Sequence, residues 1–65
     1  MKSYTYYFSQ NMHIDCFGDG LAYLIVHHNT GQTAYLQGDD AIQFEKEIEL
    51  TNEEWTVEDV CKEYL

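Results

Sequence analysis

Hydrophobic and polar residues alternate with a period of two along the first part of the chain. In residues 3–9, Tyr4, Tyr6 and Phe8 alternate with Thr5, Tyr7 and Ser9, and in residues 12–16 the apolar set is Met12, Ile14 and Cys16. Side chains of a strand point alternately to its two faces, so this period is typical of strands with one buried face. We therefore predict two strands, separated by a turn at residues 10–11.

A third apolar run is hydrophobic on both faces. Residues 21–28 carry Tyr23 and Ile25 on one side and Leu24 and Val26 on the other, the pattern of a central strand. The next three residues, Asn-Thr-Gly, fit a hairpin loop that needs glycine in a left-handed conformation, and residues 32–37 complete the hairpin. Together the four segments predict an antiparallel meander.

The segment 41–50 can be interpreted with either period. A helix would align only Ala41, Phe44 and Ile48 on one face, and would leave Ile42 and Leu50 on its polar side. A strand would place all the apolar residues except Ala41 on one face, and this pattern favours a fifth strand. Its outward face would then be a row of glutamates, namely Glu45, Glu47 and Glu49.

The end of the chain predicts a helix over residues 52–64. Thr51 followed by Glu54 matches a capping box, and Leu50 before it could pack on Trp55 as a hydrophobic staple. Apolar residues then recur at helical spacing and would pack on the sheet: Val57, Val60, Cys61 and Tyr64. The predicted fold is a single α+β domain over residues 1–65, an antiparallel meander of four or five short strands with one C-terminal helix packed on one face.

The length of the chain argues against an enzyme. A domain of 65 residues buries only about 60% of its unfolded surface, which leaves little material to enclose a catalytic cleft. The sequence has no glycine-rich phosphate loop and no nucleophile elbow. We expect neither catalytic residues nor a cofactor.

The cysteines and histidines have spacings that argue against a metal site. Cys16 and Cys61 match neither zinc-ligand spacing nor a disulfide framework, so both are expected to be reduced and partly buried. Neighbouring residues of a strand point to opposite faces, so His27 and His28 cannot bind one metal ion together. A site built from His13, Asp15 and one of these two remains geometrically conceivable.

The charge of the chain is concentrated in its last 27 residues. These hold ten of the twelve acidic residues and two lysines, or about −8 of the formal −9. With three lysines and no arginine in the chain, approach to a nucleic acid would be repelled. The acidic segment suits a basic partner, although it could instead serve only to keep the domain soluble and free of aggregation.

No signal peptide or membrane span is expected from the sequence. The longest unbroken apolar run covers residues 21–26, far short of a span. The expected compartment is the cytoplasm, or the host cytoplasm for a phage-encoded protein.

In size, acidity and absence of a catalytic motif, the chain resembles small inhibitors carried by phages or plasmids, such as anti-CRISPR and antirestriction proteins that imitate DNA charge. The resemblance implies binding to a basic surface of a nucleic-acid-handling protein, without direct contact to nucleic acid or membrane, and a homodimer is left open. The residues expected to carry that binding are Glu45, Glu47, Glu49, Glu53, Glu54, Glu58, Asp59 and Trp55.

A second, local resemblance points to a different function. Residues 29–36, 40–44 and 56–60 are similar to the hairpin, first helix and second helix of leader-peptide recognition domains related to the pyrroloquinoline-quinone peptide chaperone. That family implies binding of an extended peptide beside an exposed strand. It also requires residues 41–50 to be helical.

Overall fold

A computed structural model describes residues 3–65, and its first half is a four-stranded antiparallel sheet. The strands are β1 (Ser3–Phe8), β2 (Met12–Phe17), β3 (Ala22–His27) and β4 (Thr33–Gln37). They lie in the sheet in sequence order, which is the predicted meander. In the β3–β4 hairpin, Gly31 has a φ of 75°, the left-handed conformation that the sequence predicts.

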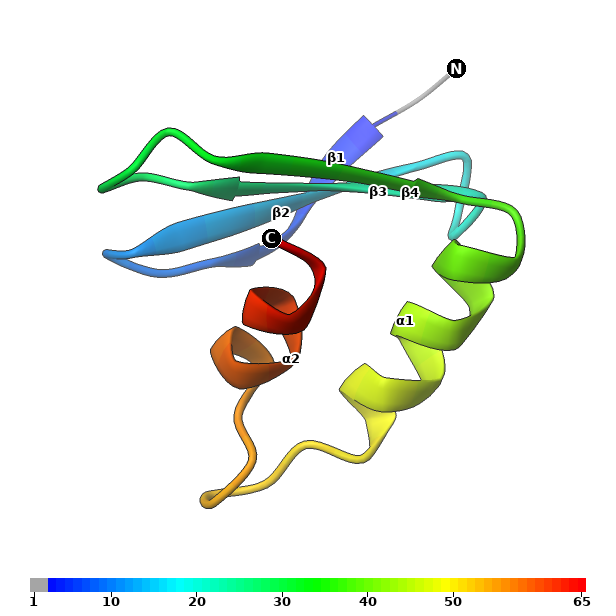
Figure 1. Cartoon of the computed structure of the whole chain (residues 1–65). Coiled ribbons are helices and arrows are strands. Elements are labelled where there is room, and N and C mark those ends of the chain that lie inside the picture. The colour runs from blue at the N-terminus through cyan, green and yellow to red at the C-terminus, as the bar shows by residue number, and fades with distance from the viewer. Residues whose placement is uncertain (1–2) are drawn as a thin grey trace.

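Two helices follow the sheet: α1 (Asp39–Glu49) and α2 (Val57–Tyr64). Figure 1 shows both helices on the same side of the sheet, with α2 beside α1. The molecule is therefore an α+β fold with a C-terminal helix, as predicted, and it has one helix more than predicted. No helix within residues 3–65 is long and apolar enough to cross a membrane.

The core lies between the sheet and the helices. Met12, Ile14 and Cys16 of β2 are all buried, which confirms the alternation predicted there. Phe44 of α1 is fully buried, and its ring centroid lies 5.2 Å from that of Tyr23 in the sheet. The predicted stripe of the last helix also packs here, with two residues buried and two partly buried: Val60, Cys61, Val57 and Tyr64.

A β-bulge in β1 changes which of its side chains point towards the helices. Tyr4 pairs with Cys16 and Tyr7 pairs with Ile14, so one residue more separates the pair on β1 than on β2. Directly paired residues share a face, so Tyr4 and Tyr7 both point to the helical side, and Phe8 points to the opposite side. The simple alternation predicted for residues 3–9 is interrupted at Tyr6.

The prediction of a strand over residues 41–50 is wrong, because Asp39–Glu49 forms a helix. The helix buries Ala41 and Phe44, while Ile42 and Leu50 remain 54% and 73% exposed. Two signals favoured the helix. The acidic pair Asp39-Asp40 occupies the first turn, where the helix dipole stabilises negative charge, and the segment is rich in the helix formers Ala, Gln, Glu and Lys.

The prediction that the last helix begins after Thr51 is also wrong, because α2 begins at Val57 with Thr56 as its N-cap. Thr51 instead donates a 2.7 Å hydrogen bond to the carbonyl of Ile48, at the end of α1. The Asn52 side chain accepts from the backbone N–H groups of Glu54 and Trp55, each at 2.8 Å, and so forms a turn. A second capping box, Thr56 with Asp59, starts the helix five residues later.

Candidate interaction surfaces

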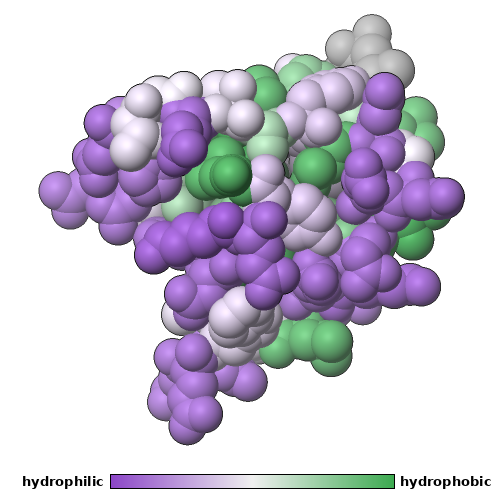
Figure 2. Space-filling model, in the orientation of Figure 1, coloured by the Kyte–Doolittle hydropathy of each residue, from purple (hydrophilic) through white to green (hydrophobic). Residues whose placement is uncertain are grey.

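The three glutamates expected in one row lie on different sides of α1. Residues four apart share a helical face, so Glu45 and Glu49 lie on one side and Glu47 lies on the other. The predicted strand row is therefore wrong as a geometry, although all three residues belong to the helical layer. Figure 2 shows hydrophilic residues over most of the visible surface of that layer.

Glu45 and Glu47 flank the buried stripe of α1, and each accepts a hydrogen bond from a tyrosine. Tyr23 of the sheet donates to Glu45 at 3.2 Å, and Tyr64 of α2 donates to Glu47 at 2.6 Å. Burial raises the pKa of the Tyr64 hydroxyl to about 12, with Glu47 adding to the effect. These two carboxylates therefore fasten α1 to the sheet and to α2.

Glu58 makes similar contacts from α2 to the first hairpin. It accepts from the Tyr7 hydroxyl and from the Asn11 amide, each at 3.2 Å. The Ser9 hydroxyl, followed by Asn11 and Tyr7, lowers the pKa of the Glu58 carboxyl below its usual value. Such donors favour the ionised carboxylate, so Glu58 serves as an anchor between the two ends of the chain.

Asp59 also has a structural contact within the helix. Its carboxylate accepts from the Thr56 backbone N–H at 3.0 Å, and the Thr56 hydroxyl accepts from the Asp59 N–H at 3.2 Å. The Thr56 backbone N–H and then its hydroxyl hold the pKa of Asp59 below its usual value. Half of the eight predicted partner-binding residues therefore accept internal hydrogen bonds with their carboxylates: Glu45, Glu47, Glu58 and Asp59.

The other predicted residues project into solvent. Glu49, Glu53 and Glu54 are exposed, and Trp55 is 40% exposed. With Leu50 largely exposed, Leu50 and Trp55 do not form the buried staple that the sequence predicts. Glu53 and Glu54 line a shallow hollow of about 420 Å³ together with Asn52. Three further acidic residues of the helical layer, which the sequence pattern does not single out, are also exposed: Asp39, Asp40 and Glu63.

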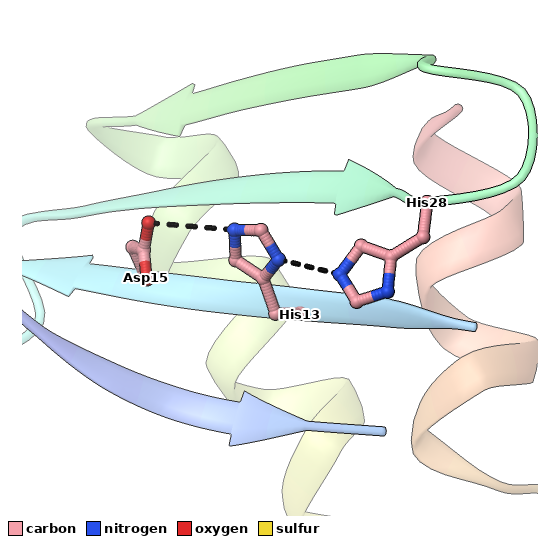
Figure 3. Close-up of polar contacts among 3 residues, drawn as sticks. All are labelled: His13, Asp15 and His28. Atoms are coloured by element: carbon pink, nitrogen blue, oxygen red, sulfur yellow. Dashed lines mark hydrogen bonds and ion pairs between the residues drawn. The ribbon is translucent and has the colours of Figure 1, made fainter. Parts of the chain in front are cut away.

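The opposite face of the sheet carries a polar chain of three side chains, drawn in Figure 3. His13 lies between its two partners, with Nε2 3.7 Å from Asp15 Oδ2 and Nδ1 2.7 Å from His28 Nε2. His28 Nδ1 lies 3.1 Å from the carbonyl oxygen of Gln10. Figure 3 shows these side chains on the side of the sheet away from the helices.

The residues of the conceivable metal site therefore lie close together, but their side chains interact with one another. His13, Asp15 and His28 are neighbours. His27 faces the other way, because it is paired with the buried Met12. In the part of the chain that the structure describes, no group of three or more His, Cys, Asp and Glu side chains is arranged to hold a metal ion. Both cysteines are free, as expected, and they are fully buried rather than partly buried. Burial raises the pKa of Cys61 to about 12.

Comparisons with known proteins found no family model, no curated protein and no solved structure that matches this chain.

Proposed function

We propose that the chain is a non-enzymatic protein-binding module whose acidic helical layer occupies a basic, nucleic-acid-binding surface of another protein. The observation that carries the proposal is the exposure of carboxylates around the two helices. Glu49, Glu53 and Glu54 make no side-chain hydrogen bond within residues 3–65 and so are available to a partner. Asp39, Asp40 and Glu63 extend the same layer.

The role of this surface is electrostatic. Clustered charge of one sign speeds the encounter with a surface of opposite charge, and aromatic side chains then add short-range contacts. Trp55 lies one residue after Glu53-Glu54 and is partly exposed, so it is placed to supply such a contact. The basic surface of a nucleic-acid-handling protein is the natural complement of such a layer, because it already binds a polyanion.

The test uses a triple charge reversal that leaves the internal hydrogen bonds in place: Glu49→Lys, Glu53→Lys and Glu54→Lys. Wild type and variant serve as baits in lysate of the source cell, and each captured protein is assayed for DNA or RNA binding with and without the chain. Wild type should compete with the nucleic acid, and the variant should not. The matched Glu→Gln triple should be intermediate.

Competition should also weaken as salt rises, since the Debye length is about 8 Å at physiological ionic strength. Circular dichroism of both triple variants checks that the fold is retained. Binding that persists both in the reversal variant and in high salt would contradict the proposal.

A second candidate function is supported by the helix at Asp39–Glu49. A peptide-binding domain of the leader-peptide type requires this helix after the hairpin, and α2 covers the segment of its second helix. The strands β1 and β4 are the edges of the sheet and could each pair with an extended peptide. Amide shifts of β1 or β4 on titration with a peptide, unaffected by the triple reversal, would favour this function.

A further inference from the structure

Two histidine rings meet on the side of the sheet away from the helices, and the register of β2 and β3 places them there. His13 pairs with Val26 of β3. His28 continues the ladder beyond β3, since its backbone N–H donates to the Asn11 carbonyl at 2.8 Å. Val26 and His28 are two residues apart, so their side chains share a face. His28 is therefore the diagonal neighbour of His13, within reach of its side chain, as Figure 3 shows.

The nitrogens of the two rings form an inner pair and an outer pair. The inner pair, His13 Nδ1 and His28 Nε2, lies 2.7 Å apart. Each outer nitrogen faces an oxygen: His28 Nδ1 lies 3.1 Å from the Gln10 carbonyl, and His13 Nε2 lies 3.7 Å from Asp15 Oδ2. A carbonyl and an ionised carboxylate only accept hydrogen bonds, so both outer nitrogens are suited to carry the hydrogen. A neutral imidazole has one ring hydrogen, and the inner nitrogens then direct two lone pairs at each other. A cation between them removes that conflict.

The outer contacts are those of metal-binding histidines. A histidine that binds a metal ion through one nitrogen usually donates its other N–H to a carboxylate or a backbone carbonyl, which fixes the orientation of the ring. Both kinds of acceptor are present here, Asp15 beside His13 and the Gln10 carbonyl beside His28. The two rings are thus oriented with their inner nitrogens towards one point.

We propose that His13 Nδ1 and His28 Nε2 together bind a divalent metal ion that prefers imidazole ligands, such as Zn²⁺. A tetrahedral zinc ion, at about 2.0–2.1 Å from each nitrogen, holds two nitrogens about 3.3 Å apart, so the rings must separate by about 0.6 Å from their 2.7 Å contact. His28 is exposed, and rotation of its side chain can supply this movement.

The site has two protein ligands and is completed by water. No third His, Cys, Asp or Glu side chain joins the inner nitrogens within residues 3–65. Catalytic zinc sites use three protein ligands and structural sites use four, so zinc should bind here more weakly than at either and reversibly.

The first test is a titration of the ¹⁵N-labelled wild-type chain with zinc chloride, followed by long-range ¹H–¹⁵N spectra of the histidine rings. These spectra show whether each ring nitrogen carries a hydrogen, a lone pair or a metal ion. Zinc should shift the signals of His13 Nδ1 and His28 Nε2 and leave both outer nitrogens protonated. Ring signals that do not change at about 1 mM zinc, a concentration that detects weak binding, would overturn the proposal and leave a proton as the bridge between the rings.

Substitutions test the ligands, with zinc affinity measured by calorimetry. Loss of an outer partner typically costs about 10–100-fold in metal affinity, so Asp15→Asn should bind zinc about tenfold more weakly while the inner nitrogens still show the metal shift. A ligand should matter at least as much, so His13→Gln and His28→Gln should each lose roughly tenfold or more. His27→Gln is the matched control and should bind as wild type does, because the His27 ring faces the other way and lies 3.0 Å from Thr30 Oγ1.

Circular dichroism checks that each variant is folded, and the wild-type ring spectra test the site even if a variant is not. Wild-type affinity in a folded His13→Gln or His28→Gln chain would overturn the proposal. An equal loss in His27→Gln would do so as well.

The carboxylates of the helical layer also attract cations, and magnesium separates them from the histidine pair. Mg²⁺ prefers oxygen ligands, so an excess of magnesium chloride should neither shift the ring signals nor displace zinc. The zinc site does not depend on the proposed function, since it lies on the other side of the sheet. The triple charge reversal at Glu49, Glu53 and Glu54 should therefore retain zinc affinity. Displacement of zinc by magnesium, or its loss in the triple variant, would place the metal on the carboxylates and overturn the proposal.

Discussion

At the scale of single residues, three hydrogen bonds from tyrosine hydroxyls to glutamate carboxylates connect the elements of the fold. Tyr7, Tyr23 and Tyr64 each donate to a different glutamate, and each pair joins two different elements. The sequence predicts many carboxylates on the surface, but it does not indicate which of them have tyrosine partners. Those partners depend on how the helices pack against the sheet and each other, and this packing cannot be deduced from the spacing of residues in the sequence.

The contact between Tyr64 and Glu47 gives a prediction for alkaline solution. The pKa values of Tyr64 and Cys61 are both raised to about 12, chiefly by burial. The folded chain therefore holds these protons more tightly than the unfolded chain. Stability should be complete below about pH 8, where both unfolded groups are protonated, and should be lost as pH rises towards 12.

Urea denaturation at a series of pH values measures this loss, with two phenylalanine variants for comparison. Tyr64→Phe should lower the free energy of unfolding by about 1 kcal/mol at neutral pH, through the lost hydrogen bond, and its decline above pH 10 should be shallower. Tyr35→Phe, at an exposed position, should follow the wild-type curve. An alkaline decline that is identical in all three chains would contradict the assignment to Tyr64.

At the scale of elements, a strand or helix was predicted correctly where the hydrophobic period and the turn or cap residues of a segment indicated the same structure. The first four strands were predicted because their alternation and their turn residues indicate the same structure. Residues 41–50 carried two conflicting signals, and the period of two was misleading because Ile42 and Leu50 are exposed apolar residues. A single exposed apolar side chain is common on protein surfaces, so such positions weaken any argument from period alone.

The start of α2 shows the same ambiguity at a smaller scale. Thr51 and Thr56 both precede an acidic residue by three positions, and only the second is the helix cap. Asn52 decides between them, since its side chain already satisfies two backbone N–H groups in a turn. That competition between an asparagine and a helix is visible in the structure and was not weighed from the sequence.

Substitution of the two threonines tests this boundary. Thr56→Ala should lower the free energy of unfolding by about 1 kcal/mol, because the Asp59 N–H loses its acceptor and the box is broken. Thr56→Ser keeps the hydroxyl and should retain most of that stability. Thr51→Ala removes only the bond to the Ile48 carbonyl and should cost less. The reverse order of the two alanine variants, in denaturation midpoints, would place the cap at Thr51.

At the scale of the whole molecule, the charge asymmetry along the sequence becomes an asymmetry between two faces. The nearly neutral first half forms the sheet and the acidic second half forms the helical layer, so the two halves of the sequence become two layers in space. The sequence was sufficient to predict an acidic surface on the second half of the chain. It could not identify which face of the sheet is left uncovered, because the strands alone do not show on which side the helices pack.

The contacts of Glu58 also bear on the order of events in folding. Most elements pack on their neighbours in sequence: β1 on β2, β2 on β3, β3 on β4, β4 on α1 and α1 on α2. Contacts of this kind form early, because they close short loops. Glu58 instead reaches Tyr7 and Asn11 across 51 and 47 residues, so its bonds should form after the rate-limiting step.

Removal of this anchor should therefore change how long the native state lasts and leave the speed of its formation unchanged. If Glu58→Ala costs about 1 kcal/mol, stopped-flow measurements should show unfolding about fivefold faster with an unaltered folding rate. Glu63→Ala, at an exposed site on the same helix, should alter neither rate. A slower folding rate in Glu58→Ala would mean that the ends of the chain meet early. The expected result makes Glu58 a latch, which determines the lifetime of the fold.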